Sequence, residues 1–105
     1  MLTVEDRYAS KLTSEELAMW NRLYYLIYIA GYKKHVINGA FGLTPRKFLL
    51  NERGSNAYNE CTVTLRKVID ALTQGLEHGD YPTSYSSDDE ATIQFAQTIN
   101  KYIGS

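Results

Sequence analysis

Residues 13–37 read TSEELAMWNRLYYLIYIAGYKKHVI. Thr13 and Glu16 match the capping box, in which two side chains bond the free backbone amides at the start of a helix. This start signal favours a helix over the rival strand that the Tyr- and Ile-rich run 23–30 suggests. The stretch therefore predicts a helix from Ser14 to about Ile37, with Asn38-Gly39 as its left-handed stop.

Wound as a helix, this stretch is apolar on two sides. One side is aliphatic, and the opposite side carries four of the nine tyrosines, Tyr24, Tyr25, Tyr28 and Tyr32. A helix that is apolar on both sides must be covered on both sides. Because tyrosine suits half-wet protein interfaces, these four residues are the candidate partner-binding site, with Tyr24, Tyr28 and Tyr32 as a ridge. The alternative is that another helix of the same chain covers them.

Other helix starts are marked along the chain, and no pattern indicates a sheet. The expected further helices are 4–11 after Thr3, a short one from Thr44-Pro45 to about Arg53-Gly54, Asn56–His78 after Ser55, and a last one from Ser87 to Gly104. We therefore expect one all-α domain over residues 1–105, a compact bundle of four to five helices. The two long helices, 14–37 and 56–78, are expected to form a central antiparallel hairpin.

Composition narrows the class of protein. The chain has 105 residues, 44% of them hydrophobic and 22% charged, and a net charge of −1, which is typical of a folded globular domain. The longest apolar run is 23–30, whereas about 20 residues are needed to cross a bilayer, so no membrane contact is expected. The lone Cys61 and the absence of a signal-like start indicate a cytoplasmic protein.

Charge is distributed unevenly. Residues 32–67 hold seven Lys and Arg against two Glu, whereas residues 68–105 hold six acidic residues against Lys101. The two segments are expected to complement each other within the fold or across a dimer. The alternative is a small-anion site for a nucleotide or cyclic nucleotide, with free amides at the start of the helix after Ser55 and a tyrosine that stacks on a base. Its candidate residues are Lys33, Lys34, Arg46, Lys47, Arg53, Ser55 and Tyr58.

The sequence gives weaker support to two other functions, DNA binding and catalysis. A short helix, the turn Arg53-Gly54-Ser55 and a longer helix follow the outline of a helix-turn-helix, but the turn has little apolar support. A net-acidic chain is a poor nucleic-acid binder, so that partner is not expected. No catalytic constellation, phosphate loop or metal-ligand spacing is visible, so we expect neither enzyme activity nor a cofactor or metal.

The sequence thus predicts a non-enzymatic helical protein that binds another protein, of unknown identity, and also itself as a homo-oligomer. Its size, its tyrosine content and its lack of catalytic groups are typical of proteins with which phages and mobile elements inhibit host proteins. This is an analogy of size and style, because no motif carries it.

Overall fold

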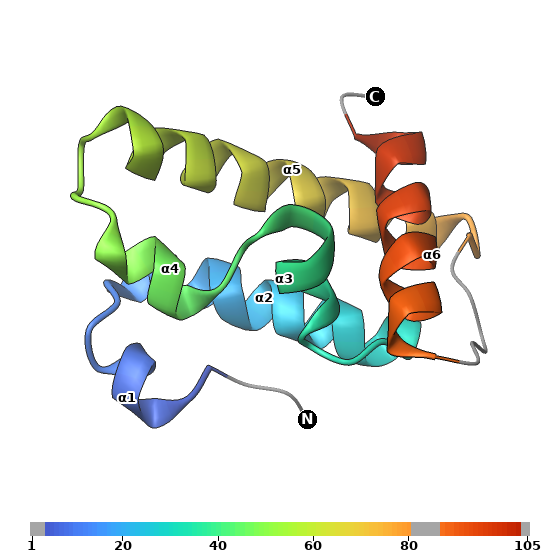
Figure 1. Cartoon of the computed structure of the whole chain (residues 1–105), viewed down its shortest axis with the longest axis horizontal. Coiled ribbons are helices and arrows are strands. Elements are labelled where there is room, and N and C mark those ends of the chain that lie inside the picture. Colours follow the sequence, from blue (N-terminus) through green and yellow to red (C-terminus); the bar gives the residue numbers. More distant parts are fainter. Residues whose placement is uncertain (1–3, 81–86, 104–105) are drawn as a thin grey trace.

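Helices make up the whole regular structure of the described part of the chain. The computed structural model describes residues 4–80 and 87–103, and within them it holds six α-helices and no strand (Figure 1). In chain order these are α1 (Asp6–Ala9), α2 (Ser14–Ala30), α3 (Val36–Phe41), α4 (Pro45–Leu50), α5 (Asn56–Glu77) and α6 (Asp88–Tyr102). The all-α prediction is confirmed. Thr3 and Gly104, assigned from sequence to the first cap and the last stop, lie outside the described residues.

The sequence-predicted caps begin four of the helices. The amide of Thr13 donates to Oε1 of Glu16 at 2.8 Å, and the amide of Glu16 donates to Oγ1 of Thr13 at 3.2 Å, a complete capping box at the start of α2. Thr44, Ser55 and Ser87 each accept a hydrogen bond from the amide three residues further on. These contacts satisfy backbone donors that a helix start leaves free.

Helix α2 ends at Ala30, seven residues before the predicted end at Ile37. Gly31 has a φ of 85°, and its amide donates to the carbonyl of Tyr28 while the amide of Tyr32 donates to that of Ile27. This is the Schellman arrangement, in which a left-handed glycine satisfies the last free carbonyls of a helix. The predicted end was wrong because Gly31 stops the helix before Asn38-Gly39 is reached.

Residues 36–41 form α3, a helix that the sequence analysis did not separate from α2. Asn38-Gly39 lies inside it, and the stop is Gly42, with a φ of 66°. Gly39 has another role, since a Cβ atom there would lie 2.9 Å from Cγ2 of Thr92 on α6. The absent side chain lets α3 and α6 approach closely.

The two long helices run parallel, so the predicted antiparallel hairpin was wrong. Glu16 and Tyr58, both near the starts of their helices, are hydrogen-bonded, while Ile29 and Glu77 line one groove near the two ends. Figure 1 shows α3 and α4 returning the chain along the bundle before α5 begins, and α6 crossing its far end. The connection between the two helices, residues 31–55, is 25 residues long. This length lets the chain run back along the bundle, so that α5 runs in the same direction as α2.

The core lies where these helices meet. Fully buried side chains come from all five helices from α2 to α6, among them Trp20, Ile37, Phe48, Leu72 and Phe95. Trp20 and Phe48 pack edge to face with ring centroids 5.9 Å apart, a favoured aromatic geometry. In the part of the chain that the structure covers, no helix has the length and apolar character needed to cross a bilayer.

Candidate functional site

The four candidate tyrosines divide between the core and the surface. Tyr24 retains 6% of its exposure and Tyr32 is buried with its ring centroid 5.0 Å from that of Phe95, so the chain itself covers both. Tyr25 and Tyr28 remain 42% and 56% exposed. The expected ridge of Tyr24, Tyr28 and Tyr32 does not form, because α2 ends at Ala30, before Tyr32, and because Tyr24 lies on its buried side.

The exposed Tyr25 belongs to a long shallow depression between α2 and α5, which we call the outer face. Two grooves that share Arg22 make it up. It is lined by Glu15, Ala18, Met19, Arg22, Tyr25, Leu26 and Ile29 from α2, and by Arg66, Ile69, Asp70, Thr73, Leu76 and Glu77 from α5. Its apolar side chains are interspersed with charged ones, and the charged Arg22 lies where the two grooves meet. Tyr28 lies one turn from Tyr25 on α2, outside these grooves.

Three of the seven candidate anion-binding residues are engaged in a buried network around Glu16. Nη2 of Arg53 donates to Oε1 of Glu16 at 2.6 Å, and the hydroxyl of Tyr58 donates to Oε2 at 2.5 Å. The hydroxyl of Ser55 accepts from the amide of Tyr58. The guanidinium of Arg53 and the hydroxyl of Tyr58 therefore hold a carboxylate of the same chain. An external anion at this helix start would have to compete with Glu16.

The charge on Glu16 is strongly stabilised in the folded protein. Burial by itself raises the pKa of a carboxyl group, because it penalises the charged form. Hydrogen bonds from Arg53, Tyr58 and Thr13 outweigh burial and lower the pKa of Glu16 from 4.5 to about 2. The same contact raises the pKa of the Tyr58 hydroxyl. Glu16 thus ties α2 to the turn before α5.

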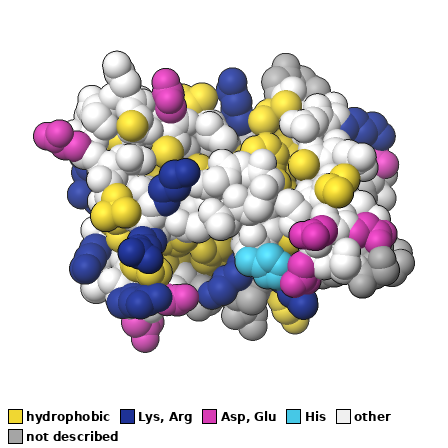
Figure 2. All heavy atoms as spheres, in the orientation of Figure 1, with side chains coloured by type: hydrophobic (Ala, Val, Ile, Leu, Met, Phe, Trp, Pro, Cys, Tyr) yellow, Lys and Arg dark blue, Asp and Glu magenta, His cyan; other side chains and the backbone are white. Residues whose placement is uncertain are grey.

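The other basic candidates face different surroundings. Nζ of Lys33 lies 3.5 Å from Asp88 at the start of α6, and so does Nε2 of His35, which joins the basic middle of the chain to its acidic end. Figure 2 shows the same separation on one face, with basic side chains gathered towards α1 and α4 and acidic ones around the start of α6. Lys47 lies on α4, with its Nζ close to Gly42.

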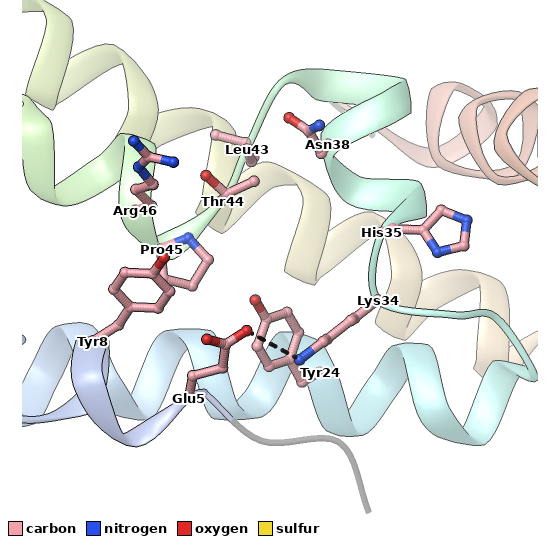
Figure 3. A pocket seen from close by; sticks show the side chains of 10 residues that line it. All are labelled: Glu5, Tyr8, Tyr24, Lys34, His35, Asn38, Leu43, Thr44, Pro45 and Arg46. Carbon is pink, nitrogen blue, oxygen red and sulfur yellow. Dashed lines mark ion pairs between the residues drawn. The ribbon is translucent and has the colours of Figure 1, made fainter.

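Lys34 and Arg46 are brought together at a cavity of about 420 Å³ between α1, α2, α3 and α4. Figure 3 shows the side chains that line it: Glu5, Tyr8, Tyr24, Lys34, His35, Asn38, Leu43, Thr44, Pro45 and Arg46. Nζ of Lys34 lies 3.9 Å from Glu5 and 6.0 Å from the centre of the Tyr24 ring. Tyr8, Asn38 and Leu43 were not anticipated from sequence, because they come from separate elements and share no local motif.

Metal-binding and comparative observations give no further assignment. Over residues 4–80 and 87–103, no three His, Cys, Asp or Glu side chains converge as metal ligands. The thiol of Cys61 is half-buried and accepts a hydrogen bond from the side chain of Asn51 at 3.3 Å. Comparison with protein families, with curated proteins and with solved structures found no match to this chain.

Proposed function

We propose that this protein is a non-enzymatic protein-interaction module that pairs with a second copy of itself through the outer face of α2 and α5. The observation that carries the proposal is the apolar surface on that face, where Tyr25 and Ile29 stay half exposed beside two grooves that meet at Arg22. A contiguous apolar surface rimmed by charge is typical of protein interfaces. Tyrosine adds a large contact area whose hydroxyl tolerates water at the rim.

Charge across the outer face favours a second copy as the occupant. Glu15 on α2 lies level with Arg66 on α5, and Arg22 lines the same groove as Asp70. If the two copies are related by a two-fold axis that runs along the groove, α2 of each copy lies over α5 of the other. This rotation does not shift residues along the groove, so residues that are level within one copy are also level across the interface. Arg22 of one copy then faces Asp70 of the second copy, so the face is complementary to itself in charge and in apolar character.

The perpendicular two-fold axis is less favourable. It lays α2 on α2 and brings the Arg22 side chains of the two copies together, a like-charge contact that costs free energy. Among the described residues, neither Arg22 nor Asp70 has an ion pair within its own chain. Pairing across copies supplies each with an opposite charge. The proposed assembly is therefore a four-helix arrangement of two α2–α5 pairs.

Light scattering coupled to size exclusion tests the pairing, with a closely matched pair of variants. Ile29→Glu puts a charge into the outer face. Ile93→Glu makes the same change on α6, outside that face, and the two side chains are comparably exposed, Ile29 at 47% and Ile93 at 57%. We expect the wild type and Ile93→Glu to elute at the dimer mass. Ile29→Glu should weaken the dimer by about tenfold or more, because it buries an unpaired carboxylate.

A charge exchange tests the orientation of the two copies. Arg22→Glu alone should weaken the dimer, since it opposes Asp70 of the second copy, and adding Asp70→Arg should restore it. A wild type that remains monomeric at high concentration would refute the pairing. Equal weakening by Ile29→Glu and Ile93→Glu would refute the assigned surface. Inhibition of a host protein remains a prediction. A pull-down tests it: a host protein that binds the Ile93→Glu variant should no longer bind the Ile29→Glu variant.

A further inference from the structure

The cavity between α1, α2, α3 and α4 has a wall on which an unpaired cation lies beside apolar residues. Leu43 and Pro45 line this wall, and Figure 3 shows Arg46 next to them. Among the described residues Arg46 has no ion pair. Across the cavity, Nζ of Lys34 lies 3.9 Å from the carboxylate of Glu5, so the charges of those two residues offset each other. The wall of Leu43, Pro45 and Arg46 therefore suits an apolar side chain with an acidic one beside it.

The first half of α6 carries that combination of side chains. Ile93 is a large apolar residue, yet it remains 57% exposed. Asp89 lies four positions earlier on α6, is exposed as well, and has no ion pair within the described chain. Residues four apart on a helix lie on the same side of it. Helix α6 therefore presents an isoleucine and an unpaired carboxylate side by side.

Opposite charges gather in two regions of one face of the molecule. Figure 2 shows basic side chains towards α1 and α4 and acidic ones around the start of α6. Within one copy, Lys33 and His35 contact Asp88, whereas Arg46 and Asp89 do not pair with each other. The unpaired charges of the two regions are thus opposite in sign. A second copy that brings its acidic region to this basic region is the occupant that charge complementarity favours.

From this arrangement we propose that the start of α6 in one copy docks at the cavity of a second copy. Ile93 lies against Leu43 and Pro45, and the carboxylate of Asp89 pairs with the guanidinium of Arg46. The two halves of the contact are different surfaces, so the contact is heterologous and further copies can add to it. It uses α4 and α6, whereas the outer face uses α2 and α5, so it does not depend on the pairing proposed above.

Light scattering at two ionic strengths tests the contact. Charge attraction reaches about 30 Å at about 0.01 M salt but only about 8 Å at about 0.15 M, so the contact should strengthen as salt is lowered. The Ile29→Glu variant isolates it, because that change places a charge in the outer face. We expect this variant to be monomeric at about 0.3 M salt and to gain mass with concentration at about 0.01 M. At the higher salt the contact is screened, so Ile93→Glu then reports on the outer face alone.

A charge exchange between two variants identifies the residues that meet. Arg46→Glu or Asp89→Arg, each added to Ile29→Glu, should weaken the low-salt association by about tenfold or more. An equal mixture of the two should associate again, because each variant then supplies the charge that the other needs. Lys67→Glu and Glu60→Arg make the same changes of net charge at exposed positions of α5, away from both halves of the contact. These control variants should associate as before.

The proposal fails if the mass of Ile29→Glu is the same at both ionic strengths. It also fails if the mixture of the two exchanged variants stays monomeric, or if the α5 control variants lose as much association as Arg46→Glu, which would indicate general charge attraction. A wild type that is monomeric at high salt but associates at low salt would refute only the pairing through the outer face. Circular dichroism confirms that each variant is folded, so that a loss of mass is attributed to the contact.

Discussion

Replacing Glu16 with glutamine tests the account of the buried network between α2 and the turn before α5. The pKa of this carboxyl falls from 4.5 to about 2 on folding, which corresponds to about 3 kcal/mol of stability at neutral pH. Glutamine imitates the protonated acid, so it loses the charge that Arg53 and Tyr58 hold. We expect Glu16→Gln to be about 3 kcal/mol less stable than the wild type at pH 7.

The pH dependence follows from the direction of the pKa change. The folded-state pKa lies below the unfolded value, so the contribution of Glu16 is complete above pH 4.5 and is lost as pH falls towards 2. The stability difference between wild type and Glu16→Gln should therefore shrink to about 1 kcal/mol near pH 3 and be nearly absent at about pH 2. Urea unfolding followed by circular dichroism at several pH values measures this difference.

Glu15→Gln is the matched control for the same series. Glu15 is the neighbouring residue on α2, but it is exposed and its pair with Arg66 lies at 3.3 Å. Exposed pairs of this kind are worth at most about 1 kcal/mol, so Glu15→Gln should change stability little at any pH. Equal losses in the two variants, or a Glu16→Gln deficit that stays constant between neutral and acid pH, would refute the network as described.

Two further substitutions probe the core and the end of α2. Leu72→Ala should lower the free energy of unfolding by about 2–5 kcal/mol, because Leu72 is fully buried. Leu50→Ala, at an exposed site, should lower it by less than about 0.5 kcal/mol. Urea unfolding measures both values, and equal losses would contradict the assigned core. Gly31→Ala should lower stability by about 1 kcal/mol because Gly31 has a φ of 85° with no atom nearby, so conformational strain is its only penalty. An unchanged or raised melting temperature would show that α2 does not end in this way.

Much of the local structure was readable from sequence, because it depends on residues at most four positions apart. The caps at Thr13, Thr44, Ser55 and Ser87 begin helices as predicted. The end of α2 was misplaced, although Gly31 was itself a visible stop signal. The anion-binding candidates were grouped by their place along the chain, whereas the structure divides them among the Glu16 network, the contact with Asp88 and the cavity.

The tertiary structure alone decided the direction of α5 and the surroundings of each tyrosine. The stop signal at the end of a helix predicts that the chain turns there, but not how far it runs back before the next helix begins. Residues 31–55 run back along the bundle far enough that α2 and α5 are parallel. Tyr24 and Tyr25 are neighbours in sequence, yet one points into the core and cavity and the other lies on the outer face. Hydrogen bonds within one helical turn are set by local residues, whereas burial depends on which distant segments pack there.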